Sequence, residues 1–227
     1  MFDKLASSDV LYHYPQESLD KLNALVPNKG CLLELGGGGI IGQAMDGSPI
    51  IGLDISPYRV KLSNNRALHA TVGDAINALP FKNDAFDTVS CIDVLHHLDQ
   101  RWNSIFAELH RVLKPGGILC IVEPDARNPF IRWTQAPGSP IPVTPWHNEP
   151  AIDPDEIIPQ LEKRNCAFEC AHITIEGHQT ERSTFPLWQR LLKAPFVILA
   201  AWYYRKLPNK FSIIATKPPN DKSSASP

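Results

Sequence analysis

The sequence lacks the features by which nucleic-acid-binding, disulfide-bonded and membrane-spanning proteins are usually identified. Its 227 residues carry a formal net charge of −2 and no run of five basic residues, so we expect no nucleic-acid partner. The five cysteines are odd in number and form no Cys-X-X-Cys pair, so we expect neither a disulfide framework nor a metal site. Three of them, Cys31, Cys91 and Cys120, lie in apolar runs, where cysteine packs as a small hydrophobic residue.

Two further absences concern membranes and export. The apolar stretch at 194–204 is far shorter than the roughly 20 residues of a membrane-spanning helix. Residues 1–5 hold no apolar segment of the kind found in signal peptides, and we therefore expect a cytoplasmic protein. The length and the 43% of hydrophobic residues fit a single domain, expected over 1–216, with a disordered tail over 217–227.

Short apolar runs alternate with helical patterns along most of the chain. This alternation indicates an α/β fold with a doubly wound, mainly parallel sheet. We expect helices at 16–26, 102–113 and 153–165, and strands at 31–35, 50–53, 71–72, 88–92, 118–122, 168–175 and 211–216. Asp153 is the expected N-cap of the last helix, because Pro154 suits the first helical position.

Two segments do not fit a bare core of strands and helices. Residues 124–154 hold eight prolines in 31 residues, which predicts a stiff, irregular cap loop. Residues 185–206 form an apolar insertion in which tryptophans and tyrosines stand beside lysines and arginines. We favour a cap over the substrate or a dimer face for its core, 186–206. Aromatic rings beside cations also suit peripheral contact with a membrane surface, and that alternative stays open.

An acid and a run of glycines follow the first expected strand. Glu34 precedes the glycines at 36–39, where the backbone can approach a ligand that any side chain would exclude. Asp54 closes the next apolar run twenty residues later and can accept hydrogen bonds from both hydroxyls of a ribose. This arrangement is typical of nucleotide-binding proteins, and dinucleotide-dependent enzymes share it.

Four further motifs follow in order: GDAINALPF at 73–81, FD at 86–87, VLHHL at 94–98 and RVLKPGG at 111–117. Together with the glycine run, they make residues 32–122 resemble the class I S-adenosylmethionine-dependent methyltransferases, in particular those that act on small molecules. The resemblance implies a seven-stranded Rossmann-like sheet with an antiparallel last strand, and S-adenosylmethionine as the cofactor. We expect the RVLKPGG motif to be structural, as a helix end, a glycine stop and the entry to a strand.

The resemblance also implies which residues bind the cofactor. They follow the ends of the first four strands: Glu34, Gly36, Gly38, Asp54, Ile55, Asp74, Ala75 and Cys91. In the family pattern Asp54 holds the ribose hydroxyls, while Ile55 and Asp74 contact the adenine. We expect Asp54 and Asp74 to face solvent in the absence of cofactor, because a buried carboxylate without a partner is costly. The family's third glycine is replaced by Ile40, and the spacing from Glu34 to Asp54 is short, which predicts a short helix after the glycines.

Three histidines are candidates for a general base: His96, His97 and His147. A histidine can take a proton near neutral pH, and such a base is needed mainly when the methyl acceptor is a hydroxyl or an ammonium group. The alternatives are a pocket wall for the adjacent pair and a surface loop for His147. Tyr12, His13 and Tyr14 could close over the cofactor or simply pack.

We therefore expect S-adenosylmethionine-dependent methyl transfer, most simply O-methylation, to a small molecule that is apolar, lipid-linked or sugar-containing. One alternative is a catalytically silent, cofactor-binding partner subunit. A second is a nicotinamide-dependent oxidoreductase, against which stand Asp74, the LKPGG motif at 113–117 and the lack of a G-x-G-x-x-G pattern at the required register. The sequence does not indicate the oligomeric state.

Overall fold

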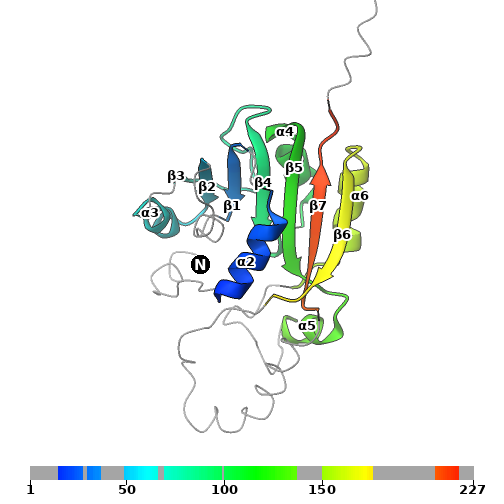
Figure 1. Cartoon of the computed structure of the whole chain (residues 1–227). Coiled ribbons are helices and arrows are strands. Elements are labelled where there is room, and N and C mark those ends of the chain that lie inside the picture. The colour runs from blue at the N-terminus through cyan, green and yellow to red at the C-terminus, as the bar shows by residue number, and fades with distance from the viewer. Residues whose placement is uncertain are drawn as a thin grey trace, which may run out of the picture.

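A seven-stranded sheet forms the centre of the molecule (Figure 1). The computed structural model describes residues 15–27, 30–36, 49–65, 69–98, 100–136, 150–175 and 208–219. The strands are β1 (Leu32–Leu35), β2 (Ile50–Asp54), β3 (His69–Val72), β4 (Phe86–Ile92), β5 (Leu113–Pro124), β6 (Ala167–Ile173) and β7 (Lys210–Thr216). Their order is β3-β2-β1-β4-β5-β7-β6, and β7 runs antiparallel to both neighbours. The predicted mainly parallel sheet with an antiparallel last strand is confirmed.

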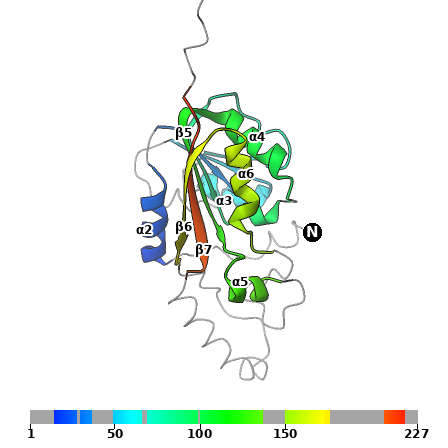
Figure 2. The ribbon, with the colours of Figure 1, turned by 90° about the vertical axis from the view of Figure 1, so that its right-hand side faces the viewer.

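Helices cover both faces of this sheet. They are α2 (Gln16–Leu25), α3 (Pro57–Asn65), the short 3-10 helix η2 (Leu95–His97), α4 (Trp102–Val112), α5 (Pro129–Thr134) and α6 (Pro154–Glu162). Figure 2 shows α2 on one face and α4 and α6 on the other. Because neighbouring strand residues point to opposite faces, Leu32 packs in the apolar cluster beneath α2, whereas Leu33 and Leu35 pack in the cluster beneath α4 and α6.

The three helices expected from the sequence are present, with ends that differ by a few residues. Asp153 caps α6 as expected, its side chain accepting a hydrogen bond from the Asp155 N–H at 3.0 Å. Cys91 and Cys120 are buried in strands, and burial raises the pKa of the Cys120 thiol to about 12, so this thiol stays neutral. They pack as small apolar residues, as predicted.

Two helices were not expected from the sequence. α3 begins at Pro57 and is polar on most sides, so it has no apolar stripe from which to predict it. α5 lies inside 124–154, where we expected irregular chain throughout. Asn128 caps it by accepting hydrogen bonds from the Phe130 and Ile131 N–H groups, and Pro129 fills the first position.

The prediction for the RVLKPGG motif was partly wrong. β5 begins at Leu113, directly after α4, rather than at Ile118. The pairing with β4 shifts register between Phe86 and Thr88, and Gly116 has a φ of +76°, so the glycines form an irregularity within the strand.

Arg111 of the same motif has the structural role expected of it. Its guanidinium donates to the carbonyls of Leu79 and Phe81 at 3.0 and 2.8 Å and to both carboxylate oxygens of Glu108. Glu108 in turn accepts the Leu79 N–H at 2.7 Å. The pair therefore fastens the loop between β3 and β4 to α4.

Residues 137–149, 176–207 and 220–227 lie outside the described residues. Residues 37–48, which hold the glycine run except for Gly36, also lie outside them. The first three of these segments include the middle of the expected cap loop, the apolar insertion at 185–206 and most of the expected tail. Lys217, the first residue of that tail, is held in place, because its ammonium donates to Asp84 and to the carbonyls of His110 and Leu113. Among the helices of the described ranges, none has the length and apolar character to cross a membrane.

We expect Arg111→Ala to lower the free energy of unfolding by about 1–3 kcal/mol, because it leaves partly buried carbonyl and carboxylate acceptors without their donor. Urea denaturation measures this loss. Arg132→Ala, which removes an exposed arginine from α5, is the matched control and should change the stability by less than about 0.5 kcal/mol. Equal losses of stability in the two variants would show that the hydrogen bonds of Arg111 do not hold the loop between β3 and β4.

Candidate active site

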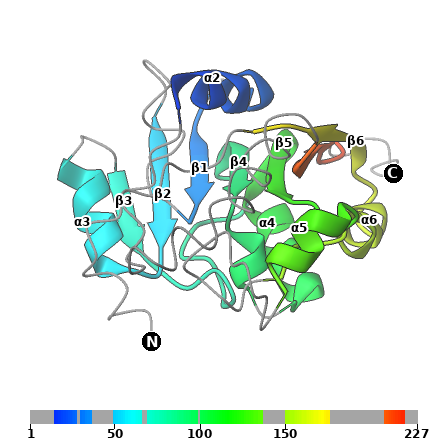
Figure 3. The ribbon, with the colours of Figure 1, turned by 90° about the horizontal axis from the view of Figure 1, so that it is seen from below.

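The predicted cofactor residues gather where β1, β2 and β4 end. Because these strands are parallel, their carboxyl ends share one edge of the sheet, which Figure 3 shows from below. Glu34 lies in β1 and is buried, Asp54 is the last residue of β2, and Cys91 of β4 pairs with Leu35. In open sheets of this kind, ligands bind outside this edge. Gly38, His147 and Tyr12, His13 and Tyr14 lie outside the described residues.

Gly36 makes the turn that ends β1. Its φ is +72°, in the left-handed region that favours glycine, and its N–H donates to the Leu53 carbonyl at 2.8 Å. A Cβ at this position would lie 2.7 Å from Cγ2 of Val94, closer than real contacts allow. The chain therefore needs glycine here, and the turn keeps side-chain atoms away from the place where the motif predicts a ligand.

The structure corrects the expectation for Asp54, whose side chain is buried rather than facing solvent, with 6% of its residue surface exposed. Its Oδ1 accepts the Ser56 N–H at 2.8 Å. Burial raises the pKa of Asp54, and the bond from Ser56 opposes this rise. That bond offsets part of the cost that led us to expect exposure. The next residue, Ile55, is 47% exposed, so an apolar side chain stands in solvent beside the carboxylate.

Asp74 follows β3 and forms a turn with its own neighbours. Oδ1 accepts the Ile76 N–H at 2.9 Å, and Oδ2 accepts from the Asn77 amide at 2.8 Å. Ala75 is partly buried and packs against the main core. Both residues lie near the end of β2, since the Gly73 N–H donates to the Asp54 carbonyl. The geometry thus gives Asp74 a turn-forming role, and its role toward adenine remains a prediction.

His96 is paired with a carboxylate that the sequence did not single out. Nδ1 of His96 lies 2.6 Å from Oε2 of Glu123, a fully buried residue near the end of β5. The other oxygen, Oε1, accepts the N–H groups of Val94 and Leu95 at 2.9 and 2.7 Å. Because an ionised carboxylate only accepts hydrogen bonds, the contact places a hydrogen on Nδ1 of His96, and Nε2 is the nitrogen that can accept a proton when the ring is neutral.

His97 lies against this pair rather than in it. Its ring centroid is 4.1 Å from that of His96, with the rings tilted by 46°. The two adjacent histidines therefore have different surroundings, since Nδ1 of His96 contacts the buried carboxylate of Glu123 and His97 packs against the His96 ring. A hint was present in the sequence, because Glu123 ends an apolar strand at the same edge as Glu34 and Asp54. The position of Glu123 in the sequence did not indicate that its carboxylate would contact His96.

A metal ion could in principle bind beside His96. Ligand atoms of Asp93, His96 and Glu123 lie within 4.8 Å of one another. However, the ammonium of Lys210 already contacts Oδ1 of Asp93, and Glu123 is engaged by three hydrogens. An ion bound to Asp93 would have to displace this ammonium, which already offsets the charge of that carboxylate.

We expect Gly36→Ala to lower the free energy of unfolding by more than Gly116→Ala, in urea denaturation of both variants. The two glycines have similar positive φ values, so the backbone strain of about 1–2 kcal/mol is common to both. Only at Gly36 does the new methyl group meet Val94, because nothing lies within 4 Å of the equivalent position at Gly116. Equal losses would mean that the turn after β1 can move away from Val94.

Comparison with known proteins identifies the same segment of the chain. Residues 33–121 match the family model described as a methyltransferase domain. The chain is 34% identical over 79 residues to 27-O-demethylrifamycin SV methyltransferase of Amycolatopsis mediterranei (strain S699), which covers 32% of this chain and 29% of the relative. It is also 34% identical over 102 residues to the phthiotriol/phenolphthiotriol dimycocerosates methyltransferase of Mycobacterium leprae (strain TN), covering 43% and 37% respectively.

The chain therefore spans well under two thirds of the length of these relatives. Among solved structures, it superposes on an S-adenosylmethionine-dependent methyltransferase from Thermotoga maritima, a possible histamine N-methyltransferase, with a TM-score of 0.62 and 19% identity, covering 89% of this chain and 88% of that one. This likeness concerns the fold. The motifs and the sheet order agree with the family match, and we conclude that residues 33–121 are those of a methyltransferase domain of the class I, S-adenosylmethionine-dependent type.

Proposed function

We propose that the protein transfers a methyl group from S-adenosylmethionine to a hydroxyl of a small molecule, with His96 as the proton acceptor and Glu123 as its positioning residue. The observation that carries this proposal is the contact of 2.6 Å between Nδ1 of His96 and the buried Glu123 carboxylate, beside the carboxyl ends of β4 and β5. When bound, the cofactor supplies an electrophilic methyl group on a sulfonium.

The residues at the ends of β1 and β2 fit such a cofactor. Gly36 makes the tight turn that ends β1, the Asp54 carboxylate can accept from ribose hydroxyls, and the exposed Ile55 offers an apolar surface to adenine. We assign the remaining contacts to the other residues of the family pattern: Glu34, Gly38, Asp74, Ala75 and Cys91. These assignments rest on the motifs.

The proton of the acceptor hydroxyl passes to Nε2 of His96. Glu123 holds the ring in the tautomer whose Nε2 is unprotonated, and its negative charge stabilises the imidazolium that forms when the proton arrives. Loss of that proton would make the acceptor oxygen the nucleophile for the methyl group that a bound cofactor would supply. His97 forms part of the wall beside His96, and the role of His147 as a base remains an expectation from the sequence.

The relatives support a small-molecule acceptor and, in one case, transfer to oxygen. One is named for 27-O-demethylrifamycin SV and the other for phthiotriol/phenolphthiotriol dimycocerosates. We propose an apolar, lipid-linked or sugar-containing acceptor on this basis. We also propose a cytoplasmic location. Residues 186–206 would serve as a cap over the acceptor, a dimer face or a contact with a membrane surface, and these alternatives rest on the composition of that segment alone.

Calorimetric titration of S-adenosylmethionine tests the cofactor site. We expect Asp54→Ala to weaken binding roughly tenfold or more, since it removes a charged acceptor of ribose hydroxyls. Glu169→Ala, which removes an exposed carboxylate from β6, should leave the affinity unchanged. Unaltered binding by Asp54→Ala would remove Asp54 from the site.

The same titration repeated at decreasing pH tests the ionisation of Asp54. Burial raises the pKa of this carboxyl, so it takes up a proton at a higher pH than the ordinary value of about 3.9. Protonation removes acceptor capacity, and we expect the affinity of the wild type to fall on acidification above that value. Asp54→Asn should lack this pH dependence.

Kinetics with labelled S-adenosylmethionine and a panel of polyketide, quinol and sugar acceptors test the base. We expect His96→Ala to lower the rate of methyl transfer by about 10²–10⁴-fold with the cofactor affinity unchanged. Glu123→Gln should lower the rate and alter its pH profile, because the amide cannot stabilise the imidazolium. His97→Ala is the control for the neighbouring ring. Full activity of His96→Ala would show that positioning alone drives the reaction.

A further inference from the structure

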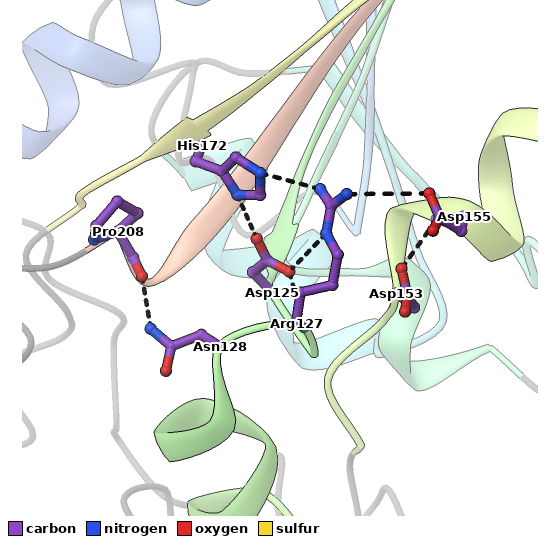
Figure 4. Close-up of polar contacts among 7 residues, drawn as sticks. All are labelled: Asp125, Arg127, Asn128, Asp153, Asp155, His172 and Pro208. Carbon is purple, nitrogen blue, oxygen red and sulfur yellow. Dashed lines mark hydrogen bonds and ion pairs between the residues drawn. The ribbon is translucent and has the colours of Figure 1, made fainter.

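A second pair of histidine and carboxylate lies at the same edge of the sheet, where β5 and β6 end (Figure 4). Asp125 directly follows β5, and His172 is the residue before the last in β6. Nδ1 of His172 lies 2.6 Å from Oδ2 of Asp125. The contact joins residues 47 positions apart in sequence, and neither residue belongs to the motifs on which the proposed function rests.

Arg127 completes this group and fixes the state of the histidine. Its guanidinium nitrogen lies 3.2 Å from Nε2 of His172. Arginine can only donate hydrogen bonds, so Nε2 accepts and the ring hydrogen is on Nδ1, directed at Asp125. The histidine therefore presents an acceptor nitrogen, and the guanidinium presents donors directly beside it.

The group combines a buried carboxylate, that of Asp125, with the partly exposed side chains of His172 and Arg127. The Asp125 side chain is 3% exposed and also accepts the Arg127 N–H at 2.9 Å, which holds the turn after β5. The side chains of His172 and Arg127 are 48% and 35% exposed. The buried carboxylate thus orients two groups that a ligand can reach, as in a built binding site.

Charged groups of both signs surround these two side chains. Besides Asp125, the carboxylate of Asp155 lies 3.9 Å from the guanidinium of Arg127, and Asp153 lies beside Asp155. An anion would meet these carboxylates, and a cation would meet Arg127. A neutral hydroxyl meets neither objection, because it can replace the direct contact of 3.2 Å between the two side chains, donating to Nε2 of His172 and accepting from Arg127. Two neighbouring hydroxyls fit still better.

The group also lies where the chain departs from the sheet and returns to it. The Asn128 amide donates to the Pro208 carbonyl at 2.6 Å, and the Asp125 N–H donates to the Asn209 carbonyl at 3.2 Å. The Ile152 N–H donates to the Pro124 carbonyl at 3.1 Å. The beginnings of α5 and α6 and of β7 are thereby fixed around Asp125, on the side of β5 away from the residues assigned to the cofactor.

We propose that Asp125, Arg127 and His172 form a subsite for the methyl acceptor that binds neighbouring neutral hydroxyls, as on a sugar ring. This inference rests on the proposed function, because it takes the ligand of the subsite to be the acceptor. It selects the polyhydroxylated members of the acceptor classes named above. Arg127 and His172 hold the hydroxyls, while Asp125 positions His172 without contacting the ligand.

Nuclear magnetic resonance of the full chain tests this subsite with a simple probe. Methyl α-D-mannopyranoside carries neighbouring hydroxyls, whereas 2-methoxytetrahydropyran has a similar ring without them. We expect the sugar to shift the imidazole signal of His172 saturably and the ether to leave it unchanged. Arg127→Ala should weaken the binding of the sugar roughly tenfold, since it removes a charged donor. Arg132→Ala removes an exposed arginine nearby and should have no effect.

No shift with the sugar, an equal shift with the ether, or equal binding by Arg127→Ala would overturn the subsite. Calorimetry with S-adenosylhomocysteine, run on the same samples, reads the cofactor site separately. We expect it to bind wild type and Arg127→Ala alike. A sugar-dependent shift in a protein that binds no S-adenosylhomocysteine would contradict the methyl-transfer proposal and leave the hydroxyl site standing.

Discussion

The buried carboxylate of Glu123 is the constraint on which the rest of the site depends. A charge without exposure to water is costly unless hydrogen bonds satisfy it, and this one meets two backbone N–H groups and one histidine. The same three contacts fix η2 after β4 and set the ring of His96. The hydrogen bonds that stabilise the carboxylate are therefore the same ones that orient the proposed base. Removing the Glu123 carboxylate should disturb both the position of η2 and the orientation of the His96 ring.

A second buried carboxylate, that of Asp125, lies two residues after Glu123 and also contacts a histidine. Asp125 is buried, accepts a backbone N–H in the turn that follows and holds His172 at 2.6 Å. One histidine reaches β5 from the loop after β4 and the other from β6, so the two pairs flank the carboxyl end of the strand. A molecule bound along this edge would have a proton acceptor at one side and hydroxyl-binding groups at the other.

Much of the fold could be predicted from the sequence, because the signals were local. Apolar runs located β1, β2 and β4, and Asp153 with Pro154 located the start of α6. α3 escaped because its polar surface carries no periodic stripe, and α5 because the surrounding prolines suggested irregular chain although Asn128-Pro129 is itself a helix start. The site residues likewise include some that a local motif predicted and some that only the fold brings together. Gly36 and Asp54 belong to a contiguous motif, whereas the partners Glu123 and Asp125 meet histidines 27 and 47 positions away through the order of the strands.

The most direct test of the account is the tautomer of His96, read from the nitrogen signals of its ring in the wild type and in Glu123→Gln at neutral pH. The account predicts a neutral ring in the wild type with hydrogen on Nδ1 and an unprotonated Nε2, and loss of this preference in the variant. A wild-type ring protonated on Nε2, or a tautomer unaffected by Glu123→Gln, would contradict the claim that the buried carboxylate prepares His96 to accept a proton.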